Sequence, residues 1–316
     1  MRCLIVGGGG FLGSHLALGL LAQGHAVRIL DRPNLHRFDG VQGSDSVEWY
    51  EGDFVNHDDV SRSLSGCDIV FHLAWTTLPK SSNDNPTYDV ETNVVGTLHL
   101  LELACQEHVR KVIFVSSGGT VYGIPKEIPI TESHATDPVC AYGISKLVIE
   151  KYLNLYHELH GLDYRILRLA NPFGERQRPT GAQGAVSVFL HKALRNETIE
   201  IWGDGTIIRD YVYIGDVVDA FLKVASYNGG HRVLNIGSGE GKSLKDVIKA
   251  IESLLGRKVL YTLLPGRKFD VPVNILDSSR ACTALGWQPK TSFDNGLSRM
   301  LNWTLETEGV AWKQCT

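Results

Sequence analysis

The chain has 316 residues, 43% hydrophobic and 21% charged, which is the composition of a globular protein large enough for a substantial core. The net charge of −4 comes without a basic cluster, which argues against a nucleic-acid partner, and no apolar run approaches the roughly 20 residues of a membrane span. The six cysteines are scattered without a C-x-x-C pair, which predicts reduced thiols and a cytoplasmic protein. No cluster of ligand residues predicts a metal site.

The first predicted elements are a strand, a tight turn and a helix. The turn holds glycines at three-residue intervals, Gly7, Gly10 and Gly13, and the helix begins around Phe11 and Leu12. A phosphate group can approach the N–H groups at a helix N-terminus only where no Cβ blocks the backbone. This turn, with Phe11 and Leu12, is therefore predicted to bind the pyrophosphate of a dinucleotide.

The second predicted strand ends in Asp31, where a carboxylate can accept both ribose hydroxyls of an adenosine. A carboxylate at this place repels the 2′-phosphate of NADP, so Asp31 predicts NAD as the cofactor. Arg32 follows directly and is included among the predicted cofactor contacts.

The third predicted strand, residues 47–54, ends in Asp53 and Phe54. Asp53 is predicted to contact the adenine amino group, with Phe54 beside the adenine ring. The alternative is an ordinary turn aspartate, and the pattern alone favours neither.

The fourth predicted strand, residues 68–74, is almost continuously apolar, which is typical of a parallel strand covered on both faces. Its end at Leu73, Ala74 and Trp75 is expected to line the cofactor. A polar loop follows, and Asn93 then lies on the first turns of a long predicted helix and is a further predicted cofactor contact.

The fifth predicted strand ends in Ser116 and Ser117, whose hydroxyls would point into the ligand crevice of an open α/β sheet. Strands and helices alternate throughout this half, which predicts a Rossmann-type, doubly wound parallel sheet. Residues 1–172 are predicted to form an NAD-binding domain, with its sheet completed by a returning segment near 210–238. Residues 173–316 are predicted to form a smaller substrate-binding region.

Tyr142 and Lys146 are four residues apart at the start of a predicted helix, and hence on one helical face. A lysine cation near a phenol favours the phenolate and so lowers the phenol pKa. Bringing a phenol from a pKa of ~10 to near 7 needs about 4 kcal/mol of such stabilisation. The pair is predicted to act as a general base with its activating cation, and both residues are expected to contact the cofactor.

These motifs together are similar to those of the extended short-chain dehydrogenase/reductases, in the NAD-dependent nucleotide-sugar epimerase/dehydratase branch. The resemblance covers nearly the whole chain, and its closest counterpart is the group of UDP-glucose/UDP-galactose 4-epimerases. The motifs that carry it are Gly7/Gly10/Gly13, Asp31, Gly52-Asp53, His72-Leu-Ala74, Asn93-x-x-Gly96-Thr97, Ser116-Ser117 with Tyr122-Gly123, Tyr142-x-x-x-Lys146, Arg168-x-x-Asn171-x-x-Gly174 and Arg209-Asp210-Tyr211.

The resemblance implies a tightly held NAD and a nucleoside-diphosphate sugar bound between the two regions. It implies that Asn171 touches the diphosphate, that Arg209 and Arg267 meet phosphate or nucleoside, and that Asp270 meets the ribose. Arginine suits a diphosphate because it forms bidentate, charge-assisted hydrogen bonds. The resemblance also implies a homodimer, although burial beneath the second region explains the apolar helix faces equally well.

The chain departs from the family pattern at three places. The catalytic hydroxyl of those epimerases lies four residues before the tyrosine of the V-Y-G segment, where this chain has Gly118, so Ser117 or Thr120 must supply it, with Ser117 preferred. Thr77 replaces a lysine that some epimerases carry and is a predicted substrate contact. Asn274 stands where those enzymes hold a pocket-gating Tyr or Cys, which suggests room for an N-acetylated sugar.

The residues before Tyr122 help to choose a reaction. Sugar 4,6-dehydratases carry an Asp-Glu pair for elimination where this chain has Gly119 and Thr120. The resemblance therefore favours a 4-epimerase, which needs only reversible hydride transfer at C4 and a general base. A 4-keto-sugar reductase or dehydrogenase using the same residues is the alternative, and a non-catalytic dinucleotide-binding protein is a remote one. The sugar, which could be N-acetylated or a uronate, and the nucleotide base stay open.

Overall fold

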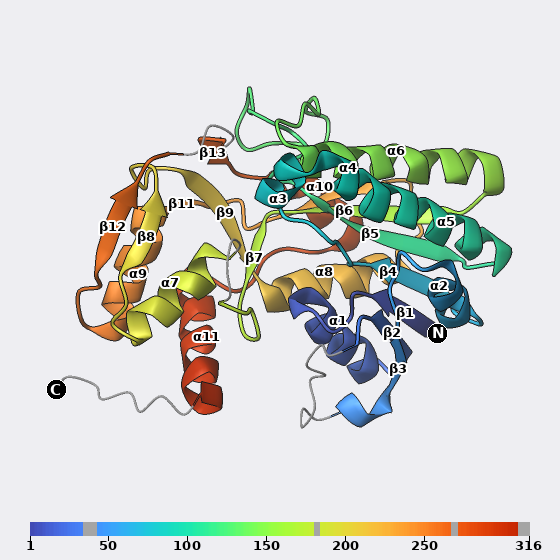
Figure 1. Ribbon diagram of the computed structural model, residues 1–316, viewed down its shortest axis with the longest axis horizontal. Helices are drawn as coiled ribbons and strands as arrows, with labels where there is room; N and C mark the ends of the chain where they lie inside the picture. The colour runs from blue at the N-terminus through green and yellow to red at the C-terminus, as the bar shows by residue number, and fades with distance from the viewer. Residues whose placement is uncertain (34–42, 180–183, 267–270, 309–316) are drawn as a thin grey trace.

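The computed structural model describes residues 1–33, 43–179, 184–266 and 271–308. Seven parallel strands form its main sheet, in the order β10-β6-β5-β4-β1-β2-β3 (Figure 1). These strands are β1 (Arg2–Val6), β2 (Ala26–Asp31), β3 (Val47–Glu51), β4 (Ile69–His72), β5 (Lys111–Ser117), β6 (Asp163–Leu169) and β10 (Val233–Ile236).

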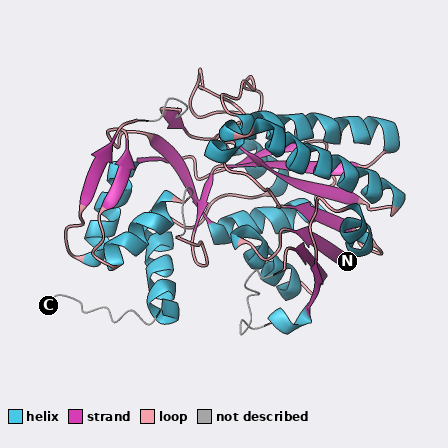
Figure 2. Cartoon of the chain, viewed as in Figure 1, coloured by secondary structure: helices cyan, strands magenta, loops and turns pink. Residues whose placement is uncertain are grey.

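Helices cover both faces of this sheet (Figure 2). One apolar cluster joins the sheet to α1 (Phe11–Ala22), α8 (Ile214–Ser226) and α10 (Ser279–Leu285). A second cluster joins the opposite face to α2 (His57–Leu64), α5 (Gly96–Gln106) and α6 (Ala141–His160). Successive residues of β1 alternate between the two clusters, so an apolar run without alternation is what this double covering requires.

The strand order places the ligand crevice. Strand β1 lies between β2 and β4, and the chain reverses its direction of progress across the sheet at β1. In open α/β sheets, ligands bind beyond the carboxyl ends of the strands at such a switch point. Gly7 follows β1 there, and Ala74, two residues after β4, donates its backbone N–H to the Val6 carbonyl at 2.8 Å.

The second lobe contains two smaller sheets. Strand β9 (Ile208–Tyr213) pairs with β7 (Asn171–Phe173), β11 (Gly241–Ser243) and β13 (Val273–Asn274), and β8 (Ile199–Trp202) pairs with β12 (Tyr261–Leu264). A third apolar cluster packs these strands against α7 (Ala185–Leu194), α9 (Leu244–Leu255) and α11 (Phe293–Glu308) (Figure 1).

Short helices join β4 to α5. They are α3 (Pro79–Asp84), α4 (Pro86–Asp89) and η2 (Val90–Val95), and η1 (Ser44–Ser46) precedes β3. The helix predicted to contain Asn93 thus begins as the one-turn π-helix η2 and continues as α5. Within the described ranges, no helix combines the length and the apolar character that crossing a membrane would require.

The predicted parallel, doubly wound sheet is confirmed, and the returning segment supplies its edge strand β10. Residues 164–174, whose apolar run predicts one strand, form two, because β6 ends at Leu169 and β7 belongs to the sheet of the second lobe. The Ala170 N–H still donates to the Ile236 carbonyl of β10 at 2.9 Å, and from Asn171 on the chain pairs with β9 instead. The division into domains at residue 172 stays a prediction.

Candidate active site

The glycine turn after β1 has the shape that a pyrophosphate requires. Gly7 has a φ of +87°, and a Cβ there would lie 2.7 Å from the Ala74 nitrogen. A Cβ on Gly13 would lie 2.5 Å from the Gly7 carbonyl oxygen, so this glycine allows the turn and helix to touch. At Gly10 the nearest atom to a Cβ would be 3.4 Å away, and the residue is exposed. Gly10 is therefore the open side of the turn, where a ligand can approach the backbone.

Helix α1 begins directly at this turn with Phe11 and Leu12. No side chain caps its N-terminus, and no acidic residue lies in its first turn. The partial positive charge of the helix end is thus left for an external anion. The turn fits the pyrophosphate of NAD by its own geometry.

Asp31 closes this turn from the end of β2. Its carboxylate accepts the backbone N–H of Gly9 at 2.8 Å and that of Arg32 at 2.9 Å. Burial raises the pKa of Asp31, while these two hydrogen bonds act in the opposite direction. A cavity of about 690 Å³ opens beside it, lined by Arg32, Pro33, Glu51, Gly52, Asp53 and Asp59. This cavity is where the predicted adenosine contacts of Arg32 and Asp53 would be made.

Of the two residues predicted to contact the adenine, Asp53 lines the cavity and Phe54 is buried. Asp53 faces the cavity, although one carboxylate oxygen accepts the Val55 N–H at 3.1 Å. Phe54 is buried, and its ring centroid lies 5.5 Å from that of His72, the last residue of β4. The ring of Phe54 is thus part of the core, and its contact with adenine stays a prediction.

Tyr142 and Lys146 begin α6, and α3 fixes that helix start. The Ser82 hydroxyl accepts the Tyr142 N–H at 3.0 Å, and the Asn83 side-chain oxygen accepts the Ala141 N–H at 2.9 Å. These bonds satisfy N–H groups that a helix end leaves unpaired, so they set the direction in which Tyr142 leaves the backbone.

Lys146 is buried in an aromatic setting. Its Nζ donates to the Val115 carbonyl at 2.8 Å and lies 3.6 Å from the centroid of the Trp75 ring. The same Nζ is 5.6 Å from the centroid of the Tyr142 ring, which itself meets Trp75 edge to face at 5.4 Å. The structure therefore brings the predicted base, its cation and Trp75, the residue expected to line the cofactor, into one contact group.

In the protein alone the pKa of Tyr142 is not lowered, so its lowering by Lys146 together with the oxidised nicotinamide stays a prediction. Desolvation raises the pKa of the Tyr142 phenol above its ordinary value, and Cys140 and Asp89 add to the effect. Burial also lowers the pKa of Lys146 well below its ordinary value, which weakens the cation that was expected to favour the phenolate. The spacing of the pair predicted their contact but could not reveal how strongly burial opposes both charges.

The turn after β5 supplies two candidate hydroxyls. Ser117 is partly exposed at the end of the strand, and the buried Thr120 hydroxyl has no hydrogen-bond partner among the described residues. Gly118 lies between them, and a Cβ there would lie 2.5 Å from Leu276 Cδ1 and 3.2 Å from the Leu169 carbonyl oxygen. This crowding explains why the chain has no hydroxyl at residue 118. Both Ser117 and Thr120 stay predicted catalytic residues.

The side chain of Ser116 is buried and hydrogen-bonded within the protein. Its hydroxyl donates to Glu150 at 2.5 Å, and Glu150 forms an ion pair with Arg168 at 2.5 Å. Only the backbone of Ser116 is left for the cofactor contact that the sequence predicted.

The loop after β4 forms the wall opposite α6. Leu73 and Ala74 bond through their N–H groups to the Val6 carbonyl, and the buried indole N–H of Trp75 has no partner among the described residues. The Thr77 hydroxyl donates a hydrogen bond to Asp89. The predicted substrate contact of Thr77 and the predicted cofactor contact of Asn93 both stay predictions.

Asn93 joins the same group of hydrogen bonds. Its side-chain oxygen accepts the Thr76 N–H at 2.9 Å, and its amide donates to Asp89 at 3.0 Å. Asp89 was missed in the sequence, because a single acid in a helical stretch gives no signal of the groups that converge on it.

The predicted substrate residues lie along β7, β9 and β13. Asn171 donates to the Asp210 carbonyl at 3.1 Å, and Arg209 donates to the Val271 carbonyl at 2.6 Å. Asn274 is buried, and its amide donates to the Gly118 carbonyl at 2.9 Å while its oxygen has no partner among the described residues. Asn274 is therefore in contact with the predicted catalytic turn. Their substrate contacts stay predictions.

Arg267 and Asp270, the other two predicted substrate residues, lie outside the described residues.

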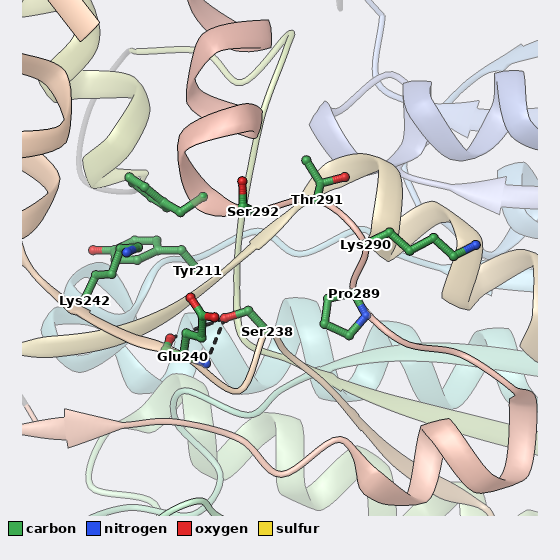
Figure 3. Close-up of a pocket in the computed structure, with 9 residues that line it drawn as sticks. Tyr211, Ser238, Glu240, Lys242, Pro289, Lys290, Thr291 and Ser292 are labelled. Carbon is green, nitrogen blue, oxygen red and sulfur yellow. Dashed lines mark hydrogen bonds between the residues drawn. The ribbon is translucent and has the colours of Figure 1, made fainter. Parts of the chain in front are cut away.

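A second cavity of about 220 Å³ lies in the second lobe (Figure 3). It is lined by Tyr211, Ser238, Glu240, Lys242, Pro289, Lys290, Thr291, Ser292 and Phe293, none of which is a predicted site residue. The predicted chemistry thus belongs to the crevice at β1, β4 and β5.

Comparison with known proteins places the chain among sugar-nucleotide enzymes. A family model described as the NAD dependent epimerase/dehydratase family matches residues 3–237. The UDP-glucose 4-epimerase of Mycolicibacterium smegmatis is 38% identical over 305 residues, which cover 95% of this chain and 97% of that protein. The dTDP-4-dehydro-6-deoxyglucose reductase of Escherichia coli is 34% identical over 310 residues, with 94% and 96% covered. The UDP-glucose 4-epimerase of Thermotoga maritima, solved with UDP-glucose, has a TM-score of 0.92 at 35% identity, with 98% and 100% covered.

Proposed function

The chain belongs to the NAD dependent epimerase/dehydratase family, and on this premise we propose that it inverts C4 of a UDP-linked sugar. Membership confirms the resemblance found in the sequence and NAD as the cofactor. The observation that carries the proposal is the contact group of Tyr142, Lys146 and Trp75 at the ends of β4 and β5. It lies at the carboxyl edge of the sheet, as does the open glycine turn.

Tyr142 acts as the general base for the sugar 4-hydroxyl. Lys146 supports its phenolate, and the hydroxyl of Ser117 or Thr120 hydrogen-bonds to O4 and relays the proton. Because burial opposes the phenolate of Tyr142, a further positive charge beside the phenol favours that phenolate. When bound, NAD supplies that charge and accepts and returns the C4 hydride.

The sugar must turn its other face to the cofactor between the two transfers. Asn171, Arg209, Arg267 and Asp270 are proposed to hold the nucleotide during this rotation, since a diphosphate offers arginine bidentate hydrogen bonds. Asn274, in contact with the catalytic turn through Gly118, is proposed to leave room for an N-acetylated sugar.

A 4-keto-sugar reductase is the second candidate, because the Escherichia coli relative with that activity is 34% identical over almost the whole chain. The two reactions use the same base and differ in whether the reduced cofactor is consumed. The stoichiometry of the nicotinamide therefore separates them.

The test uses purified protein incubated with UDP-galactose, UDP-N-acetylgalactosamine and UDP-galacturonate in turn, without added cofactor. Products are followed by NMR and NADH by absorbance near 340 nm. A C4 epimer without net NADH supports the proposal. Turnover only with added NADH or NADPH, matched by an equal absorbance change, would replace it with the reductase.

A homodimer is also proposed, on the evidence of α6. Ile144, Leu155 and Leu159 are exposed there and lie within about 60° of one another around the helix axis. An apolar stripe on a surface helix is typical of an interface. Light scattering should give twice the monomer mass, and a Leu155→Glu/Leu159→Glu variant should give the monomer.

A cytoplasmic location fits the free thiols of Cys3, Cys67, Cys105, Cys140 and Cys282.

A further inference from the structure

Asp89, at the end of α4, is a buried carboxylate in contact with both walls of the active site. It is fully inaccessible to solvent, and it accepts hydrogen bonds from three side chains. Thr77 and Asn93 donate to Oδ1, and Ser145 donates to Oδ2 at 2.5 Å. All three donors are neutral, so they stabilise the position of the carboxylate without cancelling its charge.

The positions of these donors link Asp89 to the predicted catalytic pair. Ser145 precedes Lys146 in α6, and Thr77 lies two residues after Trp75, the ring on which Lys146 Nζ rests at 3.6 Å. A single carboxylate thus fixes the backbone on both sides of the Lys146–Trp75 contact. A displacement on either side would move the ammonium relative to the phenol of Tyr142.

The charges around Lys146 make Asp89 distinctive. His72 on β4 is neutral, because burial, reinforced by Lys146, lowers its pKa to about 3. Glu150, one turn further along α6, is paired with Arg168 at 2.5 Å. The charges of Asp89 and Glu150 both oppose the lowering of the Lys146 pKa by burial, and among the described residues Asp89 is in no such ion pair. Asp89 is therefore the carboxylate best able to balance Lys146.

We propose that Asp89 is the positioning residue of the active site, which orients α6 through Ser145 and supplies a buried negative charge that favours the ammonium form of Lys146. The proposal rests on the proposed function for its meaning in catalysis, but the interaction of Asp89 with Lys146 exists without turnover. It goes beyond the base and cation that the sequence predicted, because it names the residue that positions them and the carboxylate that favours the charged lysine.

The kinetic test compares Asp89→Asn with Ser145→Ala in the NAD-containing enzyme. The first variant removes the charge while keeping the shape, and the second removes a hydrogen bond to the same carboxylate while keeping the charge. We expect Asp89→Asn to lower kcat about tenfold, and to move the alkaline limb of the pH profile of kcat down by about one pH unit, with little change in KM. Ser145→Ala should leave that limb in place. An unmoved limb in Asp89→Asn would make Asp89 a merely structural residue and overturn the proposal.

A second readout does not depend on turnover. In protein labelled at lysine, the Lys146 signal is assigned with Lys146→Met, and its titration is followed by NMR. A lower titration midpoint in Asp89→Asn than in wild type supports the proposal, and equal midpoints overturn it. A wild type that converts no UDP sugar would remove the proposed function and leave this measurement intact.

A failure of Asp89→Asn to fold is also informative. Removing one partner of a buried charge pair strands the other, whereas removing both restores balance. The Lys146→Met/Asp89→Asn double variant should then recover a cooperative unfolding transition. No recovery would show that Asp89 does not act through Lys146.

Discussion

The glycine turn and the catalytic region are built on opposite plans. The turn lies within one short stretch, residues 7–13, and works by the absence of side chains, because a Cβ on Gly7 or Gly13 would overlap neighbouring backbone atoms. The catalytic region draws side chains from the loop after β4, from η2, from the turn after β5 and from α6. Substitutions in the turn should therefore act by steric overlap, and substitutions in the catalytic region should act by changing charge or proton transfer.

The largest expected effect is in the catalytic region. Tyr142→Phe removes the proposed general base while keeping the ring that meets Trp75. We expect kcat to fall by about 10²–10⁴-fold with unchanged retention of NAD. Steady-state kinetics with UDP-galactose measure it. Tyr152→Phe, on the same helix, is the matched control, and comparable losses in both variants would remove Tyr142 from its role.

The glycine turn should respond differently at two of its positions. Gly13→Ala places a Cβ against backbone atoms of Gly7 and Gly8 that cannot move aside, so the free energy of unfolding should fall by about 3 kcal/mol. Gly10→Ala meets nothing closer than 3.4 Å, so it should leave unfolding unchanged and instead weaken NAD retention. Denaturant unfolding without NAD and the NAD released on denaturation measure the two effects. Equal destabilisation by both variants would contradict the geometry.

The turn after β5 combines a crowded glycine with candidate catalytic side chains, since Gly118 lies between Ser117 and Thr120. Gly118→Ala should cost about 1–2 kcal/mol, because the nearest atom, Leu276 Cδ1, belongs to a flexible side chain that can partly yield. Gly119→Ala, whose Cβ would lie 3.8 Å from the Ser117 hydroxyl, should be close to neutral. Thermal unfolding of the pair decides, and a costlier Gly119→Ala would show that the turn is packed differently.

Near neutral pH the smallest effect concerns His72, the last residue of β4. Its folded pKa of about 3 lies below its unfolded value of about 6.5, so the unfolded chain binds the extra proton as the pH falls. His72 should therefore cost about 1.4 kcal/mol of stability for each pH unit below about 6.5, down to its folded pKa. Unfolding of wild type, His72→Gln and the exposed control His99→Gln between pH 7 and 5 tests this. The slope should diminish in His72→Gln alone.

The same contrast explains what could be predicted from the sequence. The glycine turn and Asp31 were predictable because the geometry of a strand, turn and helix is local, and glycine spacing records it directly. The edge strand β10 was predictable because a buried parallel strand has a short apolar run. The joint between β6 and β7 was not, since it depends on the pairing of β7 with β9, a strand distant in the sequence.

The catalytic region was predictable only in part. The spacing of Tyr142 and Lys146 gave their shared face, but the direction of the phenol pKa depends on enclosure by residues elsewhere in the chain. Asp89 meets Ser145 across 56 positions, and neither residue type indicates such a bond. Tertiary contacts of this kind leave no periodic trace in a sequence.

In the proposed reaction, one hydride leaves C4 and returns to C4 within the same protein molecule. The most direct measurement uses UDP-galactose deuterated at C4, purified protein and no added cofactor, with the product analysed by NMR. We expect UDP-glucose that retains deuterium at C4, with no net reduced nicotinamide. Product with hydrogen at C4, or product formed only with added NADH, would contradict it.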